Sequence, residues 1–124
     1  MTTPSETVRL LATADRLLAS ASSPSSGTWR RGACFALRSA LEKRIDQYHT
    51  RRYPAAARCS MRAKFICLTV YADREAARAA MAVWHALSMA CHYHHYELPP
   101  TFDQLRHWRA EVRRALTLLD RSDD

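Results

Sequence analysis

Four histidines and one cysteine lie within eleven positions in the second half of the chain, and imidazole and thiol groups can transfer protons or bind metal near neutral pH. Zinc prefers this set of ligands. On a helix, however, His92 projects about 100° from Cys91 and roughly opposite His94, so the side chains cannot all reach one ion. We therefore predict neither a metal nor a cofactor. The cluster consists of His85, Cys91, His92, His94 and His95.

The histidines divide between two faces of the predicted helix. His94 continues an apolar face that includes Leu87 and Cys91, which is typical of a core histidine. A second, polar stripe lies on a different face of the same helix. We predict contact with a partner protein or a second subunit there, through His85, Ser88, Met89 and His92.

Histidine and arginine together can cleave RNA without metal, because imidazole transfers protons and guanidinium neutralises the phosphate. The candidate catalytic histidines are His92 and His94. Arg38 and Glu42 lie four positions apart on the preceding half of the chain and form either the charged part of this site or a surface ion pair.

A second choice for the catalytic pair is Arg44 and His49, which have the spacing R-x4-H. Five helical positions place the two side chains about 140° apart, so they converge only where the helix frays near Tyr48 or where the arginine wraps back. The alternative is a solvated helix end at which Arg51 and Arg52 interact favourably with the helix dipole.

The whole chain is basic, with a net charge of +7 and a pI near 9.7 over 124 residues. Such a field attracts anions, and RNA or another nucleic acid is the commonest anionic partner. Arginine supplies most of the charge, since Lys43 and Lys64 are the only lysines. The chain has neither an apolar run long enough to span a bilayer nor a signal peptide, so we expect a cytoplasmic protein without membrane contact and with reduced cysteines.

Five amphipathic segments must position these side chains. Thr3 to Glu6 reads as a capping box for a first helix, which ends at a loop over residues 20–27. Thr28 opens a second helix that ends before Tyr53-Pro54, and Ser60 caps a short third helix. Asp73 opens the longest helix, which continues to the prolines at 99 and 100.

The fifth helix follows a capping box formed by Thr101 and Gln104, and residues 120–124 form a frayed acidic tail. None of the five segments can bury an apolar stripe alone. The economical arrangement is an all-α, antiparallel bundle of four to five helices in a single domain over residues 1–124, anchored by Trp84 and Trp108.

Two segments resemble helices of HEPN domains, which are small helical bundles. Residues 34–42, CFALRSALE, resemble the R/Q-x-A-L-E pattern of the family's second helix. Residues 84–94, WHALSMACHYH, look like its last core helix. The resemblance covers roughly residues 28–98. It implies relatedness to metal-independent RNases of toxin–antitoxin, CRISPR and phage-defence systems, which usually dimerise so that two R-x4–6-H motifs share one cleft.

The resemblance departs from the family at one position. Counting back from His94 by the family spacing reaches Met89, where an active member carries arginine. The first hypothesis is therefore an HEPN-like protein that either cleaves RNA or only binds it. The alternative is a catalytically inactive interaction module that binds a partner protein or self-associates. A third hypothesis, a metal or small-molecule sensor that binds DNA, rests on the charge and on the cysteines and histidines.

Overall fold

The computed structural model describes residues 5–20, 28–92 and 99–123, and within these ranges the regular structure is entirely helical. This confirms the prediction of an all-α antiparallel bundle. The helices are α1 (Glu6–Ala19), α2 (Thr28–Arg52), α3 (Met61–Tyr71), α4 (Arg74–Cys91) and α5 (Phe102–Asp123), with a short 3₁₀ helix, η1 (Pro54–Arg58), after α2.

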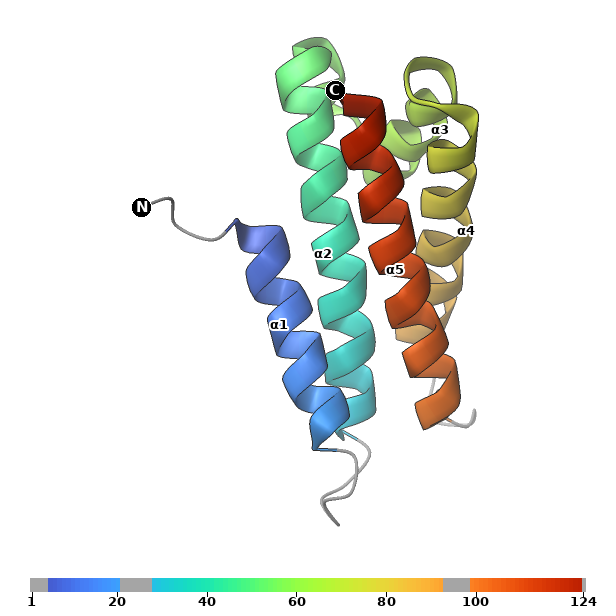
Figure 1. Ribbon diagram of the computed structural model, residues 1–124. Coiled ribbons are helices and arrows are strands. Elements are labelled where there is room, and N and C mark those ends of the chain that lie inside the picture. Colours follow the sequence, from blue (N-terminus) through green and yellow to red (C-terminus); the bar gives the residue numbers. More distant parts are fainter. Residues whose placement is uncertain (1–4, 21–27, 93–98, 124) are drawn as a thin grey trace.

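Helix α2 is the central element of the bundle (Figure 1). Helices α1 and α4 run antiparallel to it on different sides, and α5 returns antiparallel to α4 beside both α2 and α4. The short α3 lies near the C-terminal end of α2 and packs on α4. The carboxyl ends of α2 and α5 therefore lie at the same end of the bundle, close to the beginning of α1.

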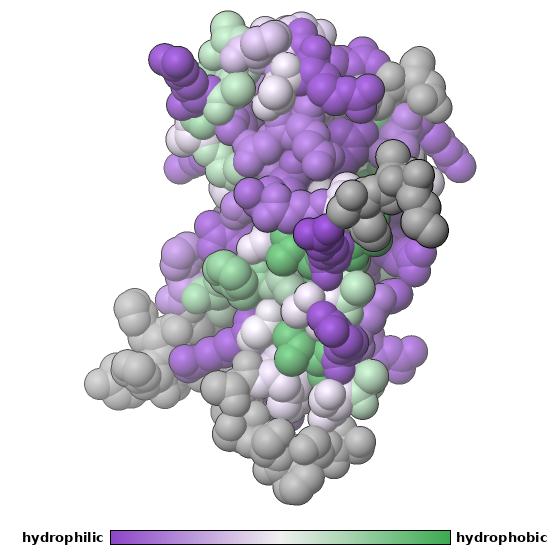
Figure 2. Space-filling model, turned by 90° about the vertical axis from the view of Figure 1, so that its left-hand side faces the viewer, coloured by the Kyte–Doolittle hydropathy of each residue, from purple (hydrophilic) through white to green (hydrophobic). Residues whose placement is uncertain are grey.

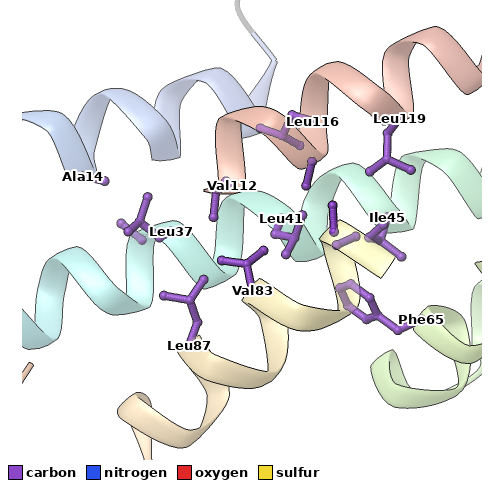
Figure 3. Packing of buried hydrophobic residues seen from close by; sticks show 14 of the residues in the cluster. Ala14, Leu37, Leu41, Ile45, Phe65, Val83, Leu87, Val112, Leu116 and Leu119 are labelled. Carbon is purple, nitrogen blue, oxygen red and sulfur yellow. The ribbon is translucent and has the colours of Figure 1, made fainter. Parts of the chain in front are cut away.

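The core is formed by the apolar stripe of α2, whose Leu37, Leu41 and Ile45 are fully buried. Figure 3 shows these side chains directed towards residues of α4, α5 and α3. Trp84, one of the two predicted anchors, stacks on Phe65 of α3 with ring centroids 4.5 Å apart. The other core residues labelled in the figure are Ala14, Val83, Leu87, Val112, Leu116 and Leu119.

Three of the predicted helix starts are confirmed by their caps. The hydroxyl of Ser60 accepts the Ala63 N–H at 3.2 Å, and the carboxylate of Asp73 accepts the Glu75 N–H at 3.1 Å. The predicted capping box of α5 is reciprocal: the Thr101 hydroxyl accepts the Gln104 N–H, and the Gln104 side chain accepts the Thr101 N–H. Each cap satisfies a backbone donor that the helix itself leaves unpaired.

Other predicted boundaries require correction. The cap of α1 is Ser5, whose hydroxyl accepts the Val8 N–H, and not Thr3. Helix α4 ends at Cys91, so the prolines at 99 and 100 do not terminate it. Helix α5 continues through Asp123 into the stretch predicted to be frayed. The predicted end of α2 before Tyr53 is confirmed. Within the described ranges, no helix is long and apolar enough to cross a membrane.

Candidate functional site

An open groove with a volume of about 540 Å³ lies where the N-terminal half of α1 faces the C-terminal halves of α2 and α5. Because α1 packs mainly on α2, the space between α1 and α5 stays open. We call this feature the arginine groove, since Arg44, Arg51 and Arg113 line it. The other lining residues are Ser5, Thr7, Val8, Leu11, Gln47, Leu116, Thr117 and Asp120.

The arginines reach the groove because of their helical spacing. Arg44 and Arg51 are seven residues apart on α2 and therefore share a face, and Gln47 lies between them on the same face. Arg113 comes from α5 on the opposite side. Asp120 supplies the single carboxylate among the lining residues, so three positive charges and one negative charge leave the described lining with a net charge of +2.

Arg44 is held in place at the base of the arginine groove. Its Nη2 and Nε donate to Oδ1 of Asp120 at 3.1 and 3.2 Å. The Arg44 side chain is only 11% exposed, whereas that of Asp120 is 69% exposed. The contact with Asp120 fixes the orientation of the Arg44 guanidinium beside the groove.

Apolar side chains also line the groove. Val8 of α1 is 55% exposed in the groove, Leu11 is half-buried, and Leu116 of α5 is buried. Figure 2, which views the molecule from the α1 side, shows a hydrophilic upper part and hydrophobic residues at the surface below it. The lining of the groove thus combines positive charge with apolar side chains.

The second-choice catalytic pair does not come together. Helix α2 is continuous through Arg52, and Arg44 extends towards Asp120 of α5. His49 is fully buried, with Nδ1 3.0 Å from the Ile45 carbonyl oxygen and its ring edge-on to Tyr48. Its Nε2 has no hydrogen-bond partner within the described structure. His49 is therefore a core residue, separate from the arginine groove.

Arg38 and Glu42 form an i,i+4 ion pair, in which Nε of Arg38 lies 2.9 Å from Oε1 of Glu42. The pair is not at the surface, since both side chains are about three-quarters buried. The Arg38 guanidinium also lies beside the thiol of Cys91, the residue that precedes His92. Arg38 thus lies near the end of α4, as a catalytic arrangement would require, but its partners are Glu42 of α2 and Cys91 of α4.

Two thiols meet next to this ion pair. The Sγ atoms of Cys34 on α2 and Cys91 on α4 lie 3.5 Å apart. The hydrogen bond with Cys34 and the positive charge of Arg38 lower the pKa of Cys91 to about 7. The hydrogen bond with Cys91, together with burial, raises the pKa of Cys34. Cys91 is therefore the thiol of the pair that ionises first.

The predicted histidine site lies only partly within the described residues. His92 is the exposed C-cap of α4, and its backbone N–H donates to the carbonyl oxygens of Ser88 and Met89. His94, like His95, lies outside the described residues. No hydrogen bond or ion pair joins the His92 side chain to Arg38 or Glu42 within the described part of the chain. Residues 5–20, 28–92 and 99–123 contain no cluster of three or more potential metal ligands.

The predicted partner stripe is partly accessible. His85 is exposed, and Met89 is 52% exposed. Ser88 is half-buried, with an Oγ that is buried and has no partner in the described structure. These three residues follow one another along α4 towards His92.

Sequence reasoning missed two features of the site. It did not assign Arg51 or Arg113 to a shared groove, because the i,i+3,i+7 spacing of Arg44, Gln47 and Arg51 marks one face of α2 but not the approach of α5. It also missed the contact between Cys34 and Cys91, which are 57 residues apart in sequence. Each cysteine lies on the apolar face of its helix, and that position was the only signal.

Comparisons of the chain with protein-family models, with curated protein sequences and with solved structures found no match. The evidence for a small all-helical bundle, with five α-helices in the described residues, is therefore the structure itself. The evidence for the HEPN resemblance is the two sequence segments alone.

Proposed function

We propose that this protein binds RNA through the arginine groove, as an RNA-binding relative of the HEPN-like bundles that its sequence resembles. The observation that carries the proposal is the convergence of Arg44, Arg51 and Arg113 on one open groove with a net charge of +2. Phosphate contacts supply most of the affinity in nucleic-acid binding, and arginine is well suited to them because its planar fork matches phosphate oxygens.

The charge of the whole chain supports a polymeric ligand over a small anion. A net charge of +7 produces a long-range field that increases association with a polyanion, and the groove provides the local contacts. Its described lining contains no aromatic side chain on which a base would stack. Binding is therefore dominated by the phosphate backbone and depends weakly on base sequence.

For the candidate residues that the structure describes, which do not include His94, geometry favours binding over cleavage. Within the described residues, neither Arg44 and His49 nor Arg38 and His92 form a contact through which imidazole and guanidinium act on one phosphate. Met89 also occupies the position where the resembling RNases carry arginine. If the protein belongs to a toxin–antitoxin or phage-defence system, we therefore propose that it binds RNA there and does not cleave it.

Fluorescence anisotropy with a short labelled single-stranded RNA at low salt tests the proposal. The variant Arg51→Gln/Arg113→Gln removes two charges from the groove. The matched control, Arg62→Gln/Arg78→Gln, removes two charges from exposed positions on α3 and α4. We expect the groove variant to lose at least about tenfold in affinity and the control to lose much less.

Three outcomes decide between alternatives. Equal loss in both double variants would remove the groove from the proposal, and absence of wild-type binding would remove RNA binding altogether. If single-stranded DNA of the same sequence binds more tightly than RNA, the partner would be DNA and not RNA. Gel analysis of the incubated RNA addresses cleavage, and the proposal expects intact RNA.

A partner-binding module is the second candidate, and the exposure of Met89 favours it, because an apolar side chain half in solvent on a helix face is a frequent element of protein interfaces. Its surface is the stripe of His85, Ser88, Met89 and His92. Light scattering after size-exclusion chromatography tests self-association. A dimer that the substitution Met89→Glu dissociates would support this candidate, and a monomer at all concentrations would count against self-association.

A further inference from the structure

Cys34 and Cys91 form a pair of thiols between two helices that are adjacent only in the fold. Their Sγ atoms are 3.5 Å apart, and Sγ of Cys34 lies 3.6 Å from the Leu87 carbonyl oxygen. In the neutral pair, the Cys91 thiol donates to Cys34 and the Cys34 thiol donates to the carbonyl. When Cys91 ionises, the Cys34 thiol can turn to donate to the thiolate. Each protonation state of the pair therefore has hydrogen-bond partners.

The two cysteines differ in access to solvent. Cys34 is 1% exposed, whereas Cys91 is only partly buried at the end of α4. A small solute therefore reaches Cys91 first. Arg38 lies beside Cys91 and favours its thiolate, whereas Glu42, the other charged group that acts on Cys91 within the described residues, opposes it. The thiolate is the reactive form of cysteine, so Cys91 reacts first, and the contact between the two sulfurs places Cys34 to react with the oxidised Cys91.

We propose that Cys34 and Cys91 are an oxidation site for hydroperoxides, in which Cys91 reacts first and Cys34 then closes a disulfide that joins α2 to the end of α4. Arg38 acts as a positioning residue that stabilises the reacting thiolate. This inference does not depend on RNA binding, because the arginine groove involves other residues.

The reaction takes place in two steps. The Cys91 thiolate attacks one oxygen of hydrogen peroxide, so that an S–O bond forms, the O–O bond breaks, and the departing hydroxide takes a proton from solvent. Cys91 is then a sulfenic acid, its sulfur oxidised by two electrons and the peroxide reduced to water. Next, the Cys34 sulfur attacks the Cys91 sulfur. The S–S bond forms, the S–O bond breaks, and the leaving hydroxide takes the Cys34 proton to give a second water.

Closure brings the two sulfurs together. They lie 3.5 Å apart and must reach the disulfide distance of about 2.05 Å. The other two cysteines are also free: Cys59 is exposed between η1 and α3, and Cys67 is half-buried on α3. Cys59 thus serves as an internal comparison for unselective oxidation.

The experiment treats the whole protein with hydrogen peroxide near pH 7 and maps disulfides by mass spectrometry without reduction. We expect a cross-link between the peptides that contain Cys34 and Cys91, loss of two titratable thiols and recovery with a dithiol reductant. The variant Cys59→Ser should form the same cross-link, and Cys91→Ser should not. A pair that stays reduced while Cys59 is oxidised would overturn the proposal.

Two further variants separate electrostatics from structure. Arg38→Gln and Glu42→Gln break the same ion pair, so a purely structural effect would change the oxidation rate in the same direction. The proposal predicts opposite changes. Arg38→Gln should slow oxidation of Cys91 about tenfold at pH 7, because less thiolate is present, and Glu42→Gln should leave the rate equal or raise it. Parallel changes, or no change in Arg38→Gln, would contradict the role of Arg38.

Discussion

Arg44 of α2 and Asp120 of α5 join two helices across the base of the arginine groove, through two hydrogen bonds to the same carboxylate oxygen. Asp120 is largely exposed and Arg44 is nearly buried. The carboxylate thus lowers the positive charge of the groove while it holds the guanidinium in position. The effects of Asp120 on ligand affinity and on stability are therefore opposed.

The substitution Asp120→Asn should separate these effects. Removal of the carboxylate raises the net charge of the described lining from +2 to +3, so RNA affinity should rise roughly two- to fivefold at moderate salt. Loss of the ion pair should lower the free energy of unfolding by about 1 kcal/mol. Anisotropy and urea unfolding measure the two quantities. Weaker RNA binding by a folded variant would contradict the assignment of the groove.

Substitution of His49 should leave the affinity for RNA unchanged. Its side chain is fully buried, and the buried Nε2 has no hydrogen-bond partner in the described structure. In His49→Leu, removal of this unpaired group offsets loss of the Nδ1 contact with Ile45, so stability should change by less than about 1.5 kcal/mol. RNA affinity should equal that of the wild type. A folded His49→Leu protein with weaker RNA binding would return His49 to the functional site.

Acid should weaken the contact between α1 and α5. Hydrogen bonds and charge from Arg109 hold the pKa of Asp15 below its ordinary 3.8. A carboxylate with a lowered pKa stabilises the fold above its unfolded-state pKa, and this stabilisation is lost as pH falls through the lower folded-state value. Thermal unfolding followed between pH 5 and about pH 2 should therefore show a loss that is smaller in Asp15→Asn. Equal acid sensitivity in the two proteins would exclude this pair as a contributor.

The Cys91 thiol should become reactive at a lower pH than an ordinary cysteine thiol. With its pKa lowered to about 7, the rate of alkylation by iodoacetamide should reach half its maximum near that pH. An unperturbed thiol ionises at about 8.5. Peptide mass spectrometry after timed alkylation reports Cys91 separately from the exposed Cys59. A midpoint for Cys91 near 8.5 or above would show that Arg38 and Cys34 do not stabilise its thiolate.

The fold was largely predictable because its signals are local. The caps at Ser60, Asp73 and Thr101 involve residues within one helical turn, the apolar stripe from Leu37 to Tyr48 repeats along about three turns of one helix, and the structure contains all of them. Helix ends were less predictable. Helix α4 ends at Cys91 without a proline or glycine at the boundary, so its sequence carried no stop signal.

The site was less predictable because it depends on contacts between helices. Arg38 and Glu42 were correctly placed on one face, but their spacing did not reveal that Cys91 lies beside them. The R-x4-H spacing of Arg44 and His49 places their side chains about 140° apart unless the helix frays, and the continuous helix directs one side chain to Asp120 and the other to the core. Side chains on one helix are ordered by its period, but their partners are set by how helices pack.

The most direct test of the central claim is the salt dependence of RNA binding, measured for the wild type and for Arg51→Gln/Arg113→Gln. Each arginine that contacts a phosphate contributes about 0.7 to the slope of log affinity against log salt for a single strand. We predict that the groove variant reduces the slope by about 1.4 and that the control Arg62→Gln/Arg78→Gln leaves it nearly unchanged. An unchanged slope in a folded groove variant would contradict RNA binding through the arginine groove.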